Sequence, residues 1–150
     1  MDKSIKSANL YLATLKALSI IDTHSHWTMK GKLFYENHLL FERIYNSSLE
    51  DLDRAAEKMV GIFGDECLDY DLQVDLLHKV LLKYKNLDGS PVQMSLAIET
   101  DFIKLSKEVY EIFEDEGTLT LGLDDMIMSI SNSREGAVYL LQRSLLDTKE

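Results

Sequence analysis

Four long segments of this 150-residue chain repeat their apolar residues at helical three- and four-residue steps. The segments span residues 4–30, 34–63, 91–116 and 123–147. A helix with one apolar stripe is stable only when it buries that stripe against other elements. The chain is therefore predicted to be an all-α helix bundle. The apolar residues that mark the four stripes are Ala8, Tyr11, Leu15 and Leu18; Phe41, Ile44, Leu52, Ala56 and Met59; Ile98, Phe102, Leu105, Val109 and Ile112; and Met126, Ile130, Ala137, Leu141 and Leu145.

Helix start and stop signals agree with this division of the chain. Ser90 stands at an N-cap position, Pro91 at the first helical position, and Gln93 completes a capping-box pattern. A glycine follows each of the first three segments, where it can end a helix. The single proline and only seven glycines also tell against a turn-rich all-β sandwich or barrel.

The connection between the second and third segments, residues 64–89, is too long to be structureless in a compact domain. The spacing of Leu72, Leu76, Leu77 and Val80 predicts a short helix there, packed outside the bundle. Two short connections and one long crossover are typical of the ferritin-like four-helix bundle. We find no repeat or second domain, so residues 1–150 are expected to form one ferritin-like domain.

Charge and cysteine usage narrow the possible functions. The 16 Lys and Arg against 26 Asp and Glu give a net charge of −10, which disfavours nonspecific binding to nucleic acid. One cysteine, Cys67, excludes an internal disulfide framework and a Cys-only zinc site. No apolar run approaches 18 residues, and the N-terminus lacks the apolar stretch of a signal peptide. We expect a soluble, cytoplasmic protein that does not contact a membrane.

Two pairs of potential metal ligands lie on the second segment. His38 and Glu42 are four residues apart, and so are Asp53 and Glu57. The members of each pair therefore share a helix face. The 11 residues from Glu42 to Asp53 are about three turns, so both pairs lie on nearly the same face. They are separated along the axis by roughly 16 Å, at ~1.5 Å per residue, which no single metal site spans.

His26 and Trp27 end the first segment, close to the start of the second in an antiparallel hairpin. His26 would join His38 and Glu42 in one nitrogen-and-oxygen half-site, and Asp53 and Glu57 would form an oxygen half-site. The alternative interpretation is an ordinary solvated polar face, since acidic pairs at this spacing are common on helix surfaces. The histidine paired with a carboxylate at ligand spacing favours the metal site.

The two half-sites can meet if a second copy packs antiparallel across a twofold axis. Imidazole together with carboxylates suits iron or zinc, and carboxylate-rich sites with open positions suit redox iron. A metal site inside one bundle would instead need glutamates with a Glu-x-x-His pattern on two of the helices. The sequence contains no Glu-x-x-His. Its absence favours a site at a subunit interface.

These residues resemble the Dps family of mini-ferritins. The resemblance is carried by His26-Trp27-x-x-x-Gly31-x-x-Phe34-x-x-x-His38, then Tyr45, then Asp53-x-x-Ala56-Glu57, and it extends to the helix order of the whole chain. It implies a dodecameric hollow shell that oxidises Fe(II), with peroxide or dioxygen, at centres shared across the dimer twofold. Ferric mineral would be stored inside the shell.

The resemblance also implies individual roles. His26 and His38 would be the nitrogen ligands, and Asp53 and Glu57 the carboxylates from the partner subunit. Glu42 stands where the family usually has aspartate, and its extra methylene would lengthen the reach to the second iron position. Trp27 would either intercept radical equivalents beside the centre or simply pack at the interface.

Two further family features concern the threefold pores and DNA. Asp124 and Asp125, near the start of the last helix, would line an acidic entry pore. Many DNA-binding members carry a lysine-rich tail, but here only Lys3 and Lys6 lie near the N-terminus, and residues 147–150 read DTKE. DNA binding is therefore expected to be weak. The remaining alternatives are a DNA-compacting shell with a secondary metal site and a structural shell without turnover.

Overall fold

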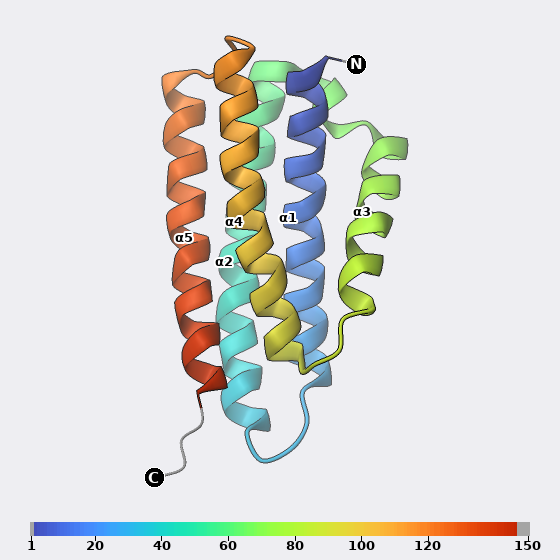
Figure 1. Ribbon diagram of the computed structural model, residues 1–150, viewed down its shortest axis with the longest axis vertical. Coiled ribbons are helices and arrows are strands. Elements are labelled where there is room, and N and C mark those ends of the chain that lie inside the picture. Colours follow the sequence, from blue (N-terminus) through green and yellow to red (C-terminus); the bar gives the residue numbers. More distant parts are fainter. Residues whose placement is uncertain (1, 147–150) are drawn as a thin grey trace.

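The computed structural model describes residues 2–146, which form four long helices side by side and a shorter helix outside them (Figure 1). No strand occurs in this range, so the prediction of an all-α bundle is confirmed. The elements are α1 (Lys3–Thr28), α2 (Phe34–Phe63), the 3-10 helix η1 (Asp65–Leu68), α3 (Tyr70–Lys85), α4 (Pro91–Asp115) and α5 (Leu121–Leu145).

Local sequence signals set the helix ends. The Ser90 hydroxyl accepts a hydrogen bond from the Gln93 backbone N–H, and the Gln93 side chain accepts one from the Ser90 N–H, so the predicted capping box is present. Helix α5 begins two residues before its predicted start because Thr120 caps it, accepting from the Leu123 N–H. The predicted end of that helix at Asp147, and the terminal residues 147–150, lie outside the described range.

The long crossover contains the predicted helix, α3, which packs along the outside of α1 (Figure 1). Polar contacts hold it there. The Gln73 side-chain amide donates to the Asn9 carbonyl oxygen over 2.8 Å, and the Lys16 Nζ donates to the Gln73 side-chain oxygen over 2.8 Å. Tyr84 of this helix is also buried and joins the apolar core that the long helices enclose.

Helix α1 supplies the centre of the core. Its residues Tyr11, Leu15 and Leu18 are fully buried, because α2, α3 and α4 all pack against it. Cys67 is buried beside them and forms no disulfide within residues 2–146. Two predicted stripe residues are not in the core. Leu145 is 39% exposed, since it lies in the last turn of α5, past the apolar layer that ends with Leu141. Ile112 is half-buried and belongs to neither apolar cluster.

No helix among residues 2–146 is both long enough and apolar enough to cross a membrane.

Candidate metal centre

His26 and His38 face each other where α1 ends and α2 begins. The Nδ1 atom of His26 lies 2.7 Å from the carbonyl oxygen of His38, and the Nδ1 atom of His38 lies 2.7 Å from the carbonyl oxygen of His26. The two rings are stacked, with centroids 3.7 Å apart and planes 17° from parallel. The short loop after α1 thus positions both imidazoles through one reciprocal pair of hydrogen bonds.

This reciprocal pair decides which ring nitrogen is available to a ligand. A carbonyl oxygen can only accept a hydrogen bond, so each Nδ1 must carry the proton. The neutral imidazole then has its lone pair on Nε2, the atom that a metal ion would use. Backbone carbonyls that hold the second nitrogen of a ligating histidine also fix the orientation of its ring. Both histidines are therefore preset as Nε2 donors.

Aromatic rings border the histidine pair. The Phe34 ring is stacked on His38 with centroids 5.2 Å apart, and Tyr45 meets His26 edge-on at 5.2 Å. His26 is 9% exposed, whereas His38 and Glu42 are half-buried. The two histidines are thus bordered by aromatic rings, and His38 and Glu42 remain partly accessible.

The other predicted half-site lies apart from the first. Asp53 and Glu57 are exposed residues of the middle of α2. Among residues 2–146 there is no group of three or more His, Cys, Asp or Glu side chains that could hold a metal ion. One chain therefore brings His26 and His38 together, and among residues 2–146 neither Glu42 nor the pair Asp53 and Glu57 completes a metal-holding group with them.

Large apolar side chains are exposed around the histidine pair. Trp27 is 67% exposed, Tyr35 66% and Leu39 43%, and the Trp27 ring lies 5.7 Å from that of His24. This end of α1 and α2 therefore carries exposed apolar side chains next to the histidine pair in the sequence.

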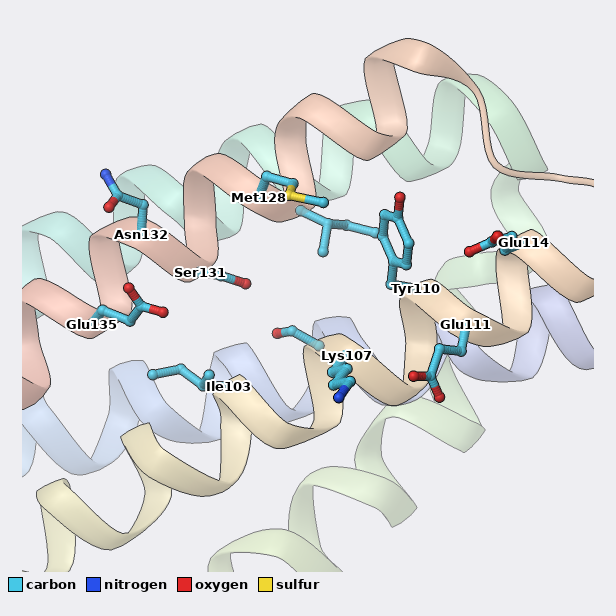
Figure 2. A pocket seen from close by; sticks show the side chains of 11 residues that line it. Ile103, Lys107, Tyr110, Glu111, Glu114, Met128, Ser131, Asn132 and Glu135 are labelled. Atoms are coloured by element: carbon cyan, nitrogen blue, oxygen red, sulfur yellow. The ribbon is translucent and has the colours of Figure 1, made fainter.

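The two acids predicted to line a pore differ in their surroundings. Asp125 is exposed, whereas Asp124 is half-buried and accepts a hydrogen bond of 3.2 Å from the Tyr110 hydroxyl. Tyr110 also lines a groove of about 480 Å³ between α4 and α5, together with the carboxylates of Glu111 and Glu135 (Figure 2). Asp124 is therefore hydrogen-bonded to a residue that lines this groove between α4 and α5.

Comparison with known proteins gives two relatives that span most of the chain. General stress protein 20U of Bacillus subtilis (strain 168) is 23% identical over 147 residues, covering 96% of this chain and 98% of that protein. The DNA protection during starvation protein of Brevibacillus brevis is 25% identical over 126 residues, covering 80% of this chain and 79% of that protein. No family model matches the sequence.

Solved structures show the same fold. Dps from Thermosynechococcus elongatus superimposes with a TM-score of 0.81 and 17% identity, over 98% of this chain and 92% of that one. The DPS protein from Vibrio cholerae O1, described as a member of a superfamily of ferritin-like diiron-carboxylate proteins, gives 0.75 and 20%, over 96% and 89%. The chain therefore has the Dps fold, and its sequence is similar to that of a DNA protection during starvation protein along most of its length. The predicted ferritin-like bundle is confirmed.

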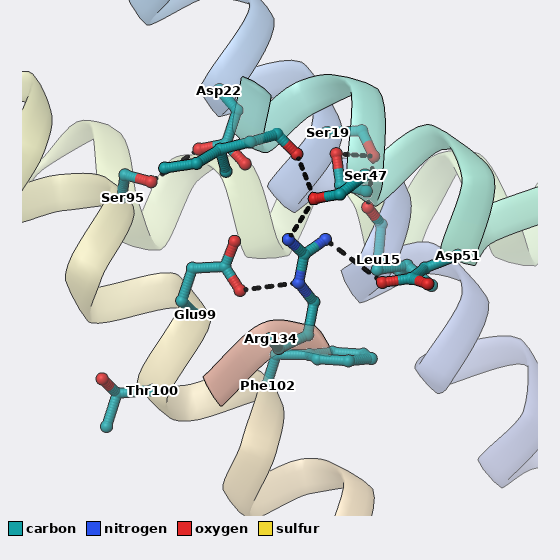
Figure 3. A network of polar contacts seen from close by, with 12 residues as sticks. Leu15, Ser19, Asp22, Ser47, Asp51, Ser95, Glu99, Thr100, Phe102 and Arg134 are labelled. Carbon is teal, nitrogen blue, oxygen red and sulfur yellow. Dashed lines mark hydrogen bonds and ion pairs between the residues drawn. The ribbon is translucent and has the colours of Figure 1, made fainter. Parts of the chain in front are cut away.

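The interior of the bundle contains a charged cluster that the apolar stripes of the sequence did not predict. Arg134 of α5 is fully buried, and its Nη2 donates to the Ser47 hydroxyl over 2.8 Å (Figure 3). Its Nε lies 3.2 Å from a carboxylate oxygen of Glu99, and its Nη1 lies 3.5 Å from one of Asp51. A signal was present, because Arg134 falls in the apolar stripe of the last segment, four residues after Ile130.

A further carboxylate lies beside this cluster. Asp22 of α1 is fully buried and accepts a hydrogen bond from the Ser95 hydroxyl. Burial raises the pKa of Asp22 to about 7, although Ser95 and Arg134 both oppose the shift. Burial likewise raises the pKa of Glu99 well above its usual range, against the attraction of Arg134. Together these groups form a polar layer across the core of the bundle.

Proposed function

We propose that this chain is an iron-detoxifying and iron-storing mini-ferritin, a ferroxidase whose centres are shared between two subunits. The observation that carries the proposal is the reciprocal hydrogen bonding of His26 and His38, which presents two Nε2 donors at one partly open end of the bundle. Iron is the substrate and the cargo. The protein would supply ligands that bind Fe(II) beside an oxidant, peroxide or dioxygen.

The five predicted ligands divide between two copies of the chain. His26, His38 and Glu42 would bind iron from one subunit, and Asp53 and Glu57 of the partner subunit would complete the centre. Two antiparallel copies of α2 related by a twofold axis would bring each half-site to its complement twice per dimer. The exposure of Asp53 and Glu57, and of apolar Trp27 beside the histidines, supports such a contact.

The proposal extends to the assembly of the shell and to the entry of iron into it. We expect a closed homo-oligomer, in Dps-like form a dodecamer, in the cytoplasm. Asp124 and Asp125 would line its entry pores, and Trp27 would intercept radical equivalents at the centre. Zn(II) suits the same nitrogen and oxygen donors and would compete with iron. A DNA-binding shell has less support, since a net charge of −10 per chain repels phosphates.

Mixed assembly tests the shared centre. His26→Ala removes the nitrogen half-site, and Asp53→Ala with Glu57→Ala removes the oxygen half-site. Each variant alone would have no complete centre. In a mixed dimer, one junction combines the two damaged halves and the other combines the two intact halves. Random equal mixing of dissociated subunits should therefore restore about one junction in four under twofold pairing.

The readout is the initial rate of Fe(II) oxidation for each variant and for the reassembled mixture, with mixed dimers verified by native mass spectrometry. A mixture no faster than its components would contradict a shared centre. Glu36→Ala, an exposed acid on another face of α2, is the matched control and should behave as the unmodified chain does. A monomer with full activity would also contradict the proposal.

A further inference from the structure

A groove lies at one end of the bundle, where the last turns of α1 and α3 meet the start of α4 (Figure 1). Its volume of about 530 Å³ is in the range of roughly 300–1,000 Å³ in which proteins hold small ligands. Each of the three helices gives it an apolar side chain: Ile21 from α1, Leu81 from α3 and Met94 from α4. Ile21 is buried and the other two are half-buried, so this α1–α3 groove has an apolar wall.

The titratable side chains that line the α1–α3 groove are all basic. They are His24 of α1 and His78 and Lys85 of α3, and no Asp or Glu is among the described residues that line it. The chain as a whole has a net charge of −10, and the groove between α4 and α5 is lined by three glutamates and one lysine. Charge complementarity therefore favours an anion in the α1–α3 groove.

These basic side chains are free to bind a ligand. Within residues 2–146, neither the two histidine side chains nor that of Lys85 form a hydrogen bond or an ion pair. Two other lysines of α3 differ, since Lys79 pairs with Asp75 at 2.9 Å and Lys83 pairs with Asp101 at 3.4 Å. An imidazole has at least one N–H donor in either protonation state, and an ammonium has three. The groove thus combines unused donors with an apolar wall.

Helix α4 adds to the preference for an anion. Pro91 and Met94, at the start of this helix, both line the groove. The N-terminal end of a helix carries a partial positive charge of roughly half an elementary charge, which stabilises a nearby carboxylate. The helix end and the three basic side chains therefore favour the same sign of ligand.

We propose that the α1–α3 groove binds a free aliphatic carboxylate, with the hydrocarbon chain against the apolar wall and the carboxylate beside Lys85 and the two imidazoles. Burial of methylene groups supplies most of the affinity. The ammonium and imidazole donors select an anionic head group, because hydrogen bonds to a charged acceptor are stronger than neutral ones. Neither His26 nor His38 lines this groove. The site goes beyond the proposed function and does not depend on it.

Isothermal titration calorimetry of the assembled protein tests this binding, with dodecanoate below its micelle concentration as the probe. We expect one dodecanoate to bind per chain. Decanoate, which is two methylenes shorter, should bind about tenfold more weakly, because each buried methylene contributes to the affinity. Dodecyltrimethylammonium, with a chain of similar length and a cationic head, should bind at least about tenfold more weakly than dodecanoate. Circular dichroism verifies that the helices persist with each ligand.

Two substitutions at exposed positions of α3 change the charge of the groove and leave the buried core intact. Lys85→Glu reverses the unpaired cation, and Leu82→Glu adds a carboxylate at a lining position that is 45% exposed. Each should weaken dodecanoate binding by at least about tenfold. Lys79→Glu makes the same charge change outside the groove, at the lysine that pairs with Asp75. This control should bind dodecanoate as the unmodified chain does.

Three results would overturn the proposal. The first is an unchanged affinity for dodecanoate in either groove variant, and the second is equal affinity for dodecanoate and its cationic analogue. The third is the absence of dodecanoate binding to the assembled protein, which would leave a second copy of the chain as the occupant of the groove.

Discussion

Two carboxylates of helix α2, only two residues apart, have opposite surroundings. Asp51 is 5% exposed and pairs with Arg134 at 3.5 Å and with Arg54 at 3.2 Å. Asp53 is exposed and forms no ion pair within residues 2–146. Two residues rotate a helix by about 200°, so neighbouring acids of one sequence run face opposite sides. Asp51 is therefore held in the core by ion pairs, whereas Asp53 is left exposed to solvent.

The energetic difference between the two faces explains this division. Burial raises the pKa of Asp51, and Arg134 opposes that shift, so the acid needs its partner to remain charged. An exposed carboxylate holds its charge in water without such a partner. The outward acids of α2 therefore need no protein partner to stay charged, whereas the inward acid is committed to the core.

The largest expected effect comes from removing ligands on the outward face. His38→Ala with Glu42→Ala should slow rapid Fe(II) oxidation by more than about 100-fold, because direct ligands matter more than the groups that orient them. The helices should remain formed, since both side chains lie at the rim of the bundle. Stopped-flow absorbance and circular dichroism measure the two effects. Oxidation at the unmodified rate would mean that the site is assigned to the wrong residues.

The next effect concerns the inward face and stability. Arg134→Met leaves Glu99, Asp51 and Asp22 without a buried cation, and should lower the free energy of unfolding by about 3–5 kcal/mol. The exposed pair of Lys79 and Asp75, at 2.9 Å, provides the comparison. Lys79→Ala should cost no more than about 0.5 kcal/mol. Urea unfolding measures both variants, and equal losses would contradict the contrast between buried and exposed charges.

The smallest effect is a dependence of stability on pH. Because the folded-state pKa of Asp22 is about 7 against an ordinary 3.8, the folded chain binds a proton that the unfolded chain releases. Its contribution to stability is present below about pH 4 and is lost as the pH rises toward 7, by at most about 4 kcal/mol.

Asp22→Asn should remove that loss, so the difference in melting temperature between variant and unmodified chain should change across this pH range. Asp75→Asn, at an exposed acid, is the control and should leave the pH dependence unchanged. Parallel curves for Asp22→Asn and the unmodified chain would show that Asp22 does not titrate in this range.

Much of the fold could be predicted because its signals are local. The second segment was predicted at 34–63 and α2 spans Phe34–Phe63, and the capping box at Ser90 is present as expected. The charged cluster was not predicted because the helical stripes are defined by apolar residues alone. Arg134 stands in such a stripe, and a charged residue there requires partners that the pattern of one helix does not name.

The candidate metal centre, too, could be predicted only in part. Spacing placed His38 with Glu42 and Asp53 with Glu57 on α2, because four residues are about one turn. Spacing did not reveal that the ring of each histidine, His26 or His38, is hydrogen-bonded to the backbone carbonyl of the other. These bonds depend on the path of the loop between α1 and α2. Their meeting with Asp53 and Glu57 of a partner subunit stays a prediction.

The sequence by itself determined the helices, their ends and the order of potential ligands along α2, because hydrogen bonds within a helix join residues close in the chain. The tertiary structure alone decided which nitrogen of each histidine is free and which acids are buried. It also decided that one buried arginine pairs with carboxylates from two other helices, Glu99 of α4 and Asp51 of α2. These outcomes depend on contacts between residues far apart in the chain, and only the packed bundle brings them together.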